Sequence, residues 1–338
     1  MKSVLVTGGA GFIGSHFLKM MTHHYPHYYF VNLDLLTYAG SLKNIRELEN
    51  LSNYLFVHGD IGDKELVDKM FEKENFDWVI NFAAESHVDR SIQNPRSFLE
   101  TNVLGTQVLL DVAKKYWQID HNDKQSHLYR PGVVFLQIST DEVYGSLKES
   151  GTFDEESPLL PNSPYAASKA SSDLIVRSYY KTYGLPILIT RCSNNYGPNQ
   201  HLEKFIPVVI TQAMKDQKIP IYGDGQQIRD WIYVKDHCHA LDSVLHQGMV
   251  GEVYNISANQ ELKNIKLAEK ILDYLGKPRD LINYVTDRLG HDYRYSMSHQ
   301  KISQSLGWQS KCHFEQGLKE TINWYIGEIL NRGYDENF

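Results

Sequence analysis

The stretch Thr7-Gly8-Gly9-Ala10-Gly11-Phe12-Ile13-Gly14 stands between a short apolar run and an amphipathic segment, and its glycines are spaced GxxGxxG. In a loop that joins a strand to a helix, the first glycine permits a tight turn and the second lets a ligand approach the backbone. The third allows close contact between helix and strand, and the first N–H groups of the helix bind phosphate. The loop therefore predicts a dinucleotide site at the start of an α/β fold.

An acidic residue after the second expected strand indicates which dinucleotide binds. Asp34 lies 20 residues beyond Gly14. A carboxylate at this place hydrogen-bonds the adenosine ribose and repels a 2′-phosphate, so NAD is expected rather than NADP. Asp60 and Ile61 follow the third expected strand and are placed to contact the adenine. Asp60 alone is equally suited to cap the next helix.

The rest of the chain continues the alternation that this loop begins. Continuous apolar runs predict strands over 3–7, 29–33, 54–58, 78–83, 133–139, 186–191 and 253–257. Periodic apolar positions predict helices over 12–22, 42–48, 64–73, 95–115, 164–183 and 314–329. Alternating strands and helices indicate parallel βαβ units, with both sheet faces covered. The expected fold is α/β, a Rossmann-type doubly wound parallel sheet.

A smaller second unit is expected because the pattern loosens after Arg191 into loops rich in Asn, Gly and Pro. We expect residues 1–190, with about 232–260, to form the NAD-binding domain. Residues 191–231 and 261–338 should form a mixed α/β lobe that binds the substrate. No long linker separates the two units, so they are expected to fold together.

The composition narrows the class of protein. The net charge is −7 over 338 residues and no basic run occurs, so a nucleic-acid partner is not expected. Cys192, Cys238 and Cys312 are widely spaced, which argues against disulfides or a metal site and fits a reducing cytoplasm. No apolar stretch approaches the roughly 18 residues of a membrane helix, so no membrane association is expected.

The redox-active side chains are predicted in Ser163-Pro164-Tyr165-Ala166-Ala167-Ser168-Lys169. Ser163 suits an N-cap and Pro164 the first helical position, so Tyr165 and Lys169 share a helix face at i and i+4. The ammonium and a cationic nicotinamide are expected to lower the tyrosine pKa from about 10. Tyr165 then accepts a hydroxyl proton as hydride leaves the carbon, and Lys169 also holds the nicotinamide ribose. Without the glycine loop, an ordinary tyrosine–lysine pair would be the better interpretation.

A carboxyl pair is predicted beside the reacting part of the substrate in Ser139-Thr140-Asp141-Glu142-Val143-Tyr144-Gly145, which follows a strand. Ligands of open α/β sheets bind at such strand ends, where Thr140 is placed to hydrogen-bond a substrate hydroxyl. Elimination of water needs a base for a C–H proton and an acid for the departing hydroxyl. Asp141 and Glu142 supply both if burial and repulsion keep one of them protonated. The alternative is an acidic turn at a strand end.

Several motifs resemble those of a known family. The glycine loop, the Tyr-x-x-x-Lys pair and the strand order resemble the extended short-chain dehydrogenase/reductase family over essentially the whole chain. Its dTDP-glucose 4,6-dehydratase branch has signatures similar to STDEVYG (139–145), AAESHVDRS (83–91), CSNNYGP (192–198) and LDLLTYAG (33–40). The resemblance implies a lobe for a nucleotide sugar, and a homodimer formed by helices of the large domain.

The same resemblance implies a role for each catalytic residue. The tyrosine matching Tyr165 removes the 4-hydroxyl proton of dTDP-glucose while NAD takes hydride from C4. The glutamate matching Glu142 removes the C5 proton, and the aspartate matching Asp141 protonates the leaving C6 hydroxyl. Hydride returns to C6, which gives dTDP-4-keto-6-deoxyglucose. The expected cofactor contacts are Gly8, Gly11, Phe12, Ile13, Gly14, Asp34, Thr37, Asp60, Ile61, Ala83, Ala84, Thr101, Tyr165, Lys169 and Asn195.

The resemblance also implies a set of residues that hold the nucleotide sugar, and their cations and polar groups suit a diphosphate, a base and a sugar. These residues are Glu85, Ser86, Thr140, Asn194, Lys204, Phe205, Pro220, Tyr222, Arg229, Asn264, Arg288 and His291. Leu289 and Tyr293 stand where the branch usually has proline and arginine. The geometry of that loop, and the base or sugar preference, are therefore open.

Other functions share parts of this pattern. A UDP-sugar 4,6-dehydratase would need only small changes in the base pocket. A nucleotide-sugar 4-epimerase needs the tyrosine and NAD but no carboxyl pair, and a UDP-glucuronic acid decarboxylase needs an arginine for the carboxylate. A noncatalytic NAD sensor needs only the glycine loop. The pathway that uses the product, rhamnose or another deoxysugar, is also open.

Overall fold

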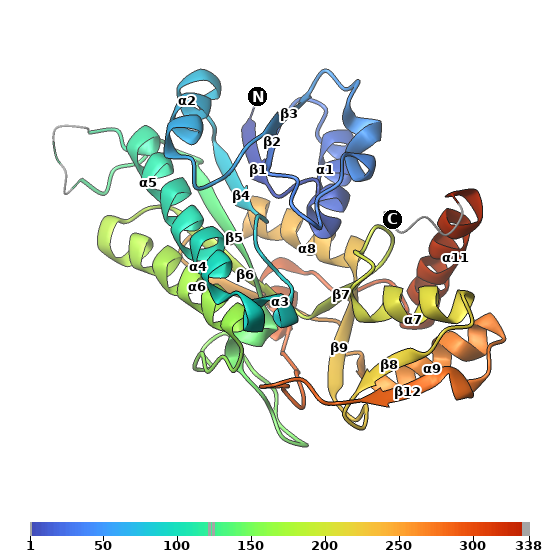
Figure 1. The fold of residues 1–338 in the computed structure, drawn as a ribbon. Helices are drawn as coiled ribbons and strands as arrows, with labels where there is room; N and C mark the ends of the chain where they lie inside the picture. Colours follow the sequence, from blue (N-terminus) through green and yellow to red (C-terminus); the bar gives the residue numbers. More distant parts are fainter. Residues whose placement is uncertain (1, 121–122, 124–125, 333–338) are drawn as a thin grey trace.

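A seven-stranded parallel sheet forms the centre of the larger lobe in the computed structural model, which describes residues 2–120, 123 and 126–332 (Figure 1). The strands are β1 (Ser3–Thr7), β2 (Tyr29–Asp34), β3 (Tyr54–His58), β4 (Trp78–Asn81), β5 (Val134–Thr140), β6 (Ile187–Cys192) and β10 (Val253–Ile256). They stand in the order β10-β6-β5-β4-β1-β2-β3, which confirms the expected Rossmann-type sheet. The strand order reverses between β1 and β4, where such sheets bind ligands at their carboxyl ends.

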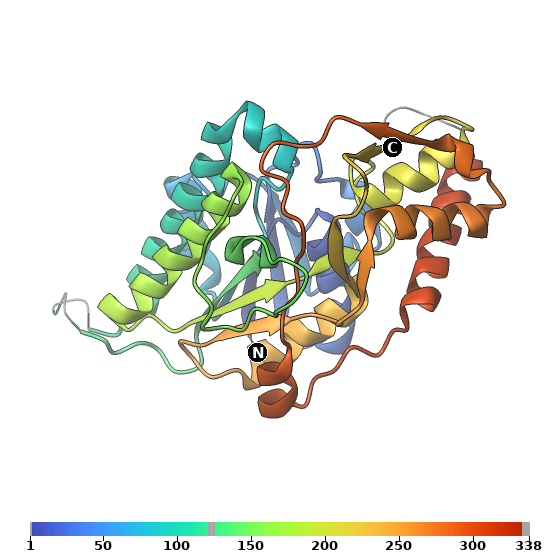
Figure 2. The same cartoon turned by 90° about the horizontal axis from the view of Figure 1, so that it is seen from below.

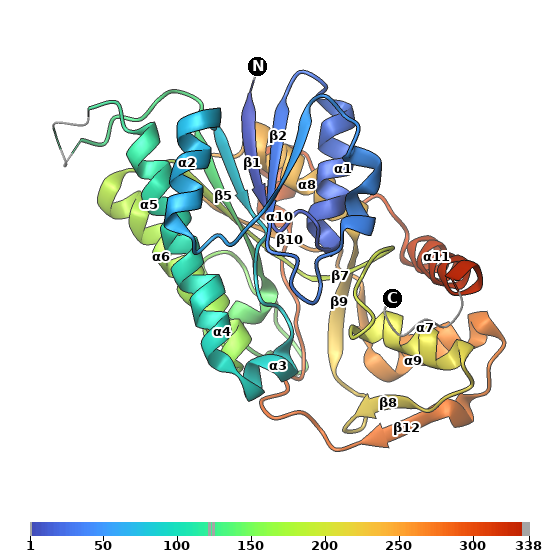
Figure 3. The same ribbon diagram turned by 45° about the horizontal axis from the view of Figure 1, so that its top comes forward.

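Helices cover both faces of this sheet (Figure 3). One layer contains α1 (Phe12–His24), α8 (Val234–Gln247), α10 (Gln300–Leu306) and the 3-10 helix η1 (Leu42–Leu48), and the other contains α2 (Lys64–Glu74), α5 (Thr106–Trp117) and α6 (Pro164–Tyr183). Successive side chains of a strand point to opposite faces. Val4 of β1 therefore packs in one core with Phe17, while Leu5 packs in the other with Phe71.

Local signals fix the ends of α6. The Ser163 side chain accepts a hydrogen bond from the Ala166 N–H, and Pro164 occupies the first turn. Gly184 ends the helix with a φ of +69°, a left-handed conformation that glycine adopts without strain. The predicted limits of this helix, 164–183, are therefore those of the structure.

The helix expected over 95–115 is interrupted, which corrects the prediction of one regular α-helix. Residues Pro95–Leu99 form α4 and Glu100–Gly105 form a π-helix, η2, that leads into α5. A short helix, α3 (Val88–Gln93), precedes them. Within the π-helix, Asn102 accepts a hydrogen bond from the Glu85 N–H at 2.9 Å. The wider turn thus ties this helix to the loop after β4.

The smaller lobe lies beside the carboxyl ends of the large sheet (Figures 1 and 2). Its strands are β7 (Asn194–Tyr196), β8 (Ile219–Tyr222), β9 (Ile228–Tyr233), β11 (Glu261–Lys263) and β12 (Ile282–Val285), in sheets β11-β9-β7 and β12-β8. Its helices are α7 (Phe205–Met214), α9 (Asn264–Leu275), η4 (Arg279–Leu281) and α11 (Phe314–Arg332). Among the described residues, none of the helices is long and apolar enough to cross a membrane.

Candidate active site

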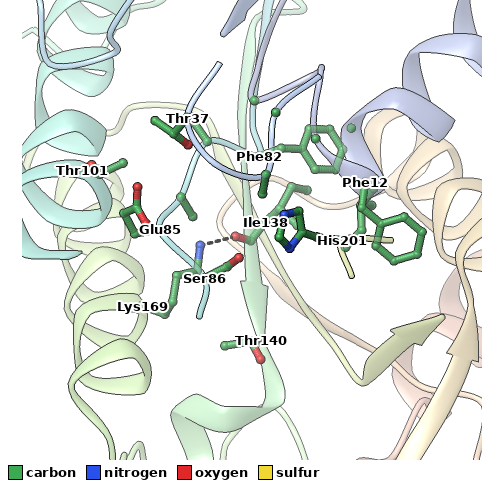
Figure 4. A pocket seen from close by; sticks show the side chains of 18 of the residues that line it. Phe12, Thr37, Phe82, Glu85, Ser86, Thr101, Ile138, Thr140, Lys169 and His201 are labelled. Carbon is green, nitrogen blue, oxygen red and sulfur yellow. Dashed lines mark hydrogen bonds between the residues drawn. The ribbon is translucent and has the colours of Figure 1, made fainter. Parts of the chain in front are cut away.

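A cavity of about 310 Å³ lies at the carboxyl ends of the central strands and is lined by both lobes (Figure 4). Every residue predicted to contact the cofactor lines it, as do all the predicted catalytic residues. Of the predicted substrate residues, the lining includes Glu85, Ser86, Thr140, Asn194 and Lys204. Motifs far apart in the sequence therefore meet in one site.

The glycine loop forms a cradle in which side chains would not fit. A Cβ on Gly8, whose φ is +69°, would lie 2.6 Å from the Ala83 backbone nitrogen. A Cβ on Gly14 would lie 2.5 Å from the Gly8 carbonyl oxygen. Gly11 stands at the N-terminus of α1, with its φ and ψ extended. The first residues of this helix line the cavity, and a helix N-terminus is where a pyrophosphate binds in such folds.

Asp34 is the last residue of β2 and lines the cavity. Its Oδ2 accepts from the Ala10 N–H and its Oδ1 from the Leu36 N–H, each at 2.8 Å. Two backbone bonds fix the carboxyl group, and each oxygen keeps a lone pair for a ribose hydroxyl. The alternative role considered for Asp60 is wrong, because Asp63 caps α2.

The Tyr165 and Lys169 side chains enter the cavity from α6. The Lys169 Nζ donates to the Ile138 carbonyl oxygen at 2.7 Å, which places the ammonium against the end of β5 (Figure 4). Burial raises the pKa of Tyr165 well above its usual value, and the charge of Glu142 adds to this effect. Burial lowers the pKa of Lys169. The expected lowering of the tyrosine pKa by the ammonium and a cationic nicotinamide together stays a prediction.

The carboxyl pair sits in η3, a 3-10 turn over Asp141–Tyr144 that follows β5 directly. The Thr140 hydroxyl donates to Asp141 Oδ1 at 3.1 Å and accepts from the Glu142 N–H at 3.3 Å. Burial, followed by the charge of Glu142, raises the pKa of Asp141 well above its usual value. Its buried Oδ2 has no hydrogen-bond partner among the described residues, so the neutral acid has a free oxygen.

The charge of Arg229 acts on both carboxyl groups, whereas that of Lys204 acts on Glu142. Burial raises the pKa of Glu142, but the positive charges of Arg229 and Lys204 act against this shift. One carboxyl group is thus held neutral beside another that ionises more readily. Such a pair can donate one proton and accept another within the same cavity.

The remaining predicted substrate residues lie outside the cavity lining, in the smaller lobe. They are Phe205, Pro220, Tyr222, Arg229, Asn264, Arg288 and His291. Arg288, Tyr222 and His291 form a cluster around the tyrosine ring. The Arg288 Cζ lies 5.0 Å from the centre of the Tyr222 ring, and the centre of the His291 ring lies 6.2 Å from it. The Arg288 Nε lies 2.7 Å from Asp89 Oδ1, on helix α3 of the larger lobe.

Arg229 was expected to reach a diphosphate, which stays a prediction, and two of its guanidinium nitrogens donate to protein carbonyl groups. Nη2 donates to the Asp292 carbonyl oxygen at 2.9 Å and Nη1 to that of Ile228 at 2.8 Å. The guanidinium carbon also lies 4.3 Å from the Tyr295 ring centre. In this arrangement Arg229 supplies positive charge near the carboxyl pair and holds the segment after Gly290.

Several lining residues were not predicted, notably Phe82, Cys192, Gln200 and His201. Phe82 precedes the motif AAESHVDRS by one residue, Gln200 and His201 follow CSNNYGP by two and three, and Cys192 is the first residue of CSNNYGP. The motif limits were therefore drawn too tightly for the first three. The His201 ring packs edge-on against Tyr38 at 5.4 Å, which joins the two lobes across the cavity. Leu289, which is 75% exposed, and Tyr293 lie outside the lining, so these two departures leave the cavity wall unchanged.

The part of the chain that the structure describes contains no cluster of three or more His, Cys, Asp or Glu able to hold a metal ion. The three cysteines are free thiols. The site combines the glycine cradle, the tyrosine–lysine pair and the carboxyl pair. This combination is typical of a dinucleotide-dependent enzyme that both oxidises and dehydrates its substrate.

The chain belongs to the GDP-mannose 4,6 dehydratase family, whose sequence model matches residues 5–321. A dTDP-glucose 4,6-dehydratase from Xanthomonas campestris pv. campestris is 48% identical over 335 residues, covering 96% of this chain and 93% of the relative. The crystal structure of a dTDP-glucose 4,6-dehydratase from Streptomyces venezuelae, with NAD bound, has a TM-score of 0.91 at 44% identity. It covers 99% of this chain and 100% of its own.

The fold is shared more widely than this activity. A UDP-glucose 4-epimerase from Thermotoga maritima has a TM-score of 0.86 at 27% identity, covering 97% of this chain and 99% of its own. The choice between dehydration and epimerisation therefore depends on the side chains of the site.

Proposed function

We propose that this chain is an NAD-dependent hydro-lyase that converts dTDP-glucose to dTDP-4-keto-6-deoxyglucose and water. The observation that carries the proposal is the carboxyl pair Asp141–Glu142, which lines the same cavity as Tyr165 and Lys169. Epimerisation needs the tyrosine but not the pair, whereas elimination needs both. Relatives at 48% identity over nearly the whole chain are named for this reaction.

The cofactor is NAD, which accepts hydride from C4 of the sugar and returns it to C6. The glycine cradle holds the pyrophosphate, and Asp34 holds the adenosine ribose. Tyr165 accepts the 4-hydroxyl proton, and the Thr140 hydroxyl orients the oxygen that loses it. Lys169 holds the nicotinamide ribose from the end of β5.

The carboxyl pair carries out the dehydration. A ketone at C4 makes the C5 proton acidic, and Glu142 removes it. Asp141, which burial keeps protonated, gives its proton to the C6 hydroxyl as water leaves. Burial also keeps bulk water away from the reactive keto sugar.

The smaller lobe, over 191–231 and 261–338, binds the nucleotide diphosphate in this proposal, and residues 1–190 with about 232–260 form the NAD domain. Residues 1, 121–122, 124–125 and 333–338 of these ranges lie outside the described residues. Lys204 and Arg288 supply the cations, and Tyr222, Pro220 and His291 surround the base. Phe205 and Asn264, which begin α7 and α9, border the same pocket.

We also propose a homodimer in the cytoplasm. Leu99 of α4, Leu104 of the π-helix and Leu174 of α6 are 50%, 54% and 55% exposed. Their helices pack side by side in the larger lobe, and each carries one of these exposed apolar side chains. An apolar face of paired helices suits a symmetric interface. Free cysteines agree with a reducing compartment.

NMR of the purified protein with dTDP-glucose in deuterated buffer tests the reaction, with UDP-glucose in parallel. The expected product is the 4-keto-6-deoxy sugar with solvent deuterium at C5, formed from dTDP-glucose without added reductant. Turnover of UDP-glucose alone would change the substrate and keep the mechanism. Retention of water in every product would refute dehydration.

A further inference from the structure

A buried polar network lies behind the carboxyl pair and involves none of the residues assigned to the reaction above. The Arg191 Nε donates to Asp173 Oδ2 at 2.9 Å, and its Nη1 donates to the Tyr144 hydroxyl oxygen at 2.8 Å. That hydroxyl in turn donates to Asn255 Oδ1 at 2.8 Å. All four side chains are 5% exposed or less.

Each member of the network comes from a different element. Tyr144 is the last residue of η3, Arg191 stands on β6, Asp173 on α6 and Asn255 on β10. Arg191 is therefore the centre of a connection between a turn, a helix and two strands of the large sheet.

A buried ion pair is a costly way to hold a core together, because both charges leave water. Apolar side chains of similar size often give equal or greater stability. Unlike an apolar side chain, the guanidinium carries N–H donors in a rigid planar arrangement, so it can fix the positions of two hydrogen-bond partners at once. The geometry thus suits the control of position better than the gain of stability.

The two partners of Arg191 belong to the two halves of the catalytic site. Tyr144 ends the turn that carries Asp141 and Glu142. Asp173 follows Tyr165 and Lys169 at intervals of four residues, so the three lie on one face of α6. The charge of Asp173 also acts on Lys169, which agrees with this placement.

We propose that Arg191 is a positioning residue that sets the carboxyl turn against the tyrosine–lysine face of α6. Tyr144 anchors it on the turn side and Asp173 on the helix side. The proposal rests on the function given above, because it assigns the helix side to the oxidation and the turn side to the elimination of water.

The two halves break different bonds. Oxidation breaks the C4–H bond and the 4-hydroxyl O–H bond, with hydride going to the cofactor and the proton to Tyr165. Elimination breaks the C5–H and C6–O bonds and forms the C5–C6 double bond, with one proton taken by Glu142 and one given by Asp141 to the leaving water. Displacements on the order of 1 Å can slow such steps by about 100-fold.

The first test is Tyr144→Phe, which removes the anchor on the turn side and keeps the ring. We expect formation of the dehydrated product to fall by roughly 10-fold, while C4 oxidation stays within about 2-fold of the unmodified protein. The 4-keto sugar that still contains its C6 hydroxyl then accumulates. Rapid acid quench with mass spectrometry separates the two species.

The second test is Asp173→Asn, which keeps the shape but weakens the anchor on the helix side. In this variant we expect the rate of C4 oxidation to fall by roughly 10-fold, so that oxidation limits turnover. The 4-keto sugar that retains its C6 hydroxyl should then not accumulate. The control is Tyr233→Phe, because Tyr233 is also buried and its hydroxyl donates to Glu320 at 2.9 Å, away from the site. This control should lose stability without changing either half.

The pattern across the three variants decides the proposal. Accumulation of the 4-keto sugar that retains its C6 hydroxyl in Tyr144→Phe, and its absence in Asp173→Asn, supports it. Equal slowing of both halves, in proportion to the fall in Tm and as in Tyr233→Phe, would show that the network only stabilises the fold. Failure of the unmodified protein to release water from dTDP-glucose would instead refute the proposed function.

Discussion

The two ends of the site differ in how their side chains are held. At the cofactor end, Gly14 and Asp34 are fixed by backbone contacts within a single βαβ unit. At the nucleotide end, Arg229 and Arg288 come from separate segments and contact other protein groups. The first end is determined by local sequence, and the second by long-range packing.

This difference explains why one end is much easier to infer from sequence. A glycine whose Cβ would collide with a backbone atom reports a local constraint. A long cationic side chain can point to a phosphate, a carboxylate or a carbonyl, and its neighbours in sequence do not decide which. The following changes test this contrast, in order of decreasing effect.

Glu142→Gln should have the largest effect, since the amide cannot accept the C5 proton. We expect dehydration to slow by roughly 10³-fold while binding of NAD and sugar is retained. Stopped-flow analysis of product formation with dTDP-glucose measures the rate. Glu149→Gln, at an exposed position outside the cavity, is the matched control. A residual rate within about 10-fold of the unmodified protein would assign the base elsewhere.

Gly14→Ala should weaken cofactor binding through a steric clash alone. The new Cβ would lie 2.5 Å from the Gly8 oxygen and 2.8 Å from the Gly9 Cα, so the loop must shift. We expect NAD to bind at least about 10-fold more weakly in calorimetric titration, equal to about 1.4 kcal/mol. Gly327→Ala in α11 has nothing within 4 Å of the added Cβ and should leave binding unchanged. Unaltered NAD affinity in Gly14→Ala would show that the cradle tolerates a side chain.

Arg288→Met should affect the nucleotide end more selectively. Loss of a charged donor to the diphosphate is expected to raise KM for dTDP-glucose by roughly 10-fold and to leave kcat almost unchanged. Steady-state kinetics measures both constants. A fall in kcat with unaltered KM would show that Arg288 acts on the reacting carbons and not on the diphosphate.

A substitution at His246, which lies away from the site, should have the smallest effect and should change neither the cofactor end nor the nucleotide end. His246 lies 2.9 Å from Asp242 Oδ1, and this hydrogen bond raises its pKa. Because the pKa of His246 is higher in the folded than in the unfolded state, its charge stabilises the fold fully at pH values below the unfolded-state pKa of about 6.5. This stabilisation is lost as the pH rises through the folded-state pKa.

His246→Gln should therefore lower Tm by about 1 °C more at pH 6 than at pH 8, with unchanged kinetics. Differential scanning calorimetry at both pH values provides the measurement. An equal loss at both would mean that the ring acts through its stacking on Tyr25 at 4.8 Å and not through its charge.

The sequence was sufficient to predict the sheet, the limits of α6 and the lining at the cofactor end. These features depend on apolar runs, an N-cap and backbone sterics, which short segments contain in full. It was insufficient for the π-helix at 100–105 and for the bonds of Arg229. Both depend on partners distant in the chain, such as Glu85 for Asn102 and Asp292 for Arg229.

The place of β10 in the chain has a consequence for biosynthesis. This strand pairs with β6 at the edge of the large sheet, yet β7, β8 and β9 lie between the two in the sequence. At ribosomal rates, the outer edge of β6 stays without its partner for roughly 3–12 seconds after it emerges. Unpaired strand edges promote association with other chains. The nascent protein is therefore most exposed to aggregation, and most dependent on chaperones, until residue 256 has left the ribosome.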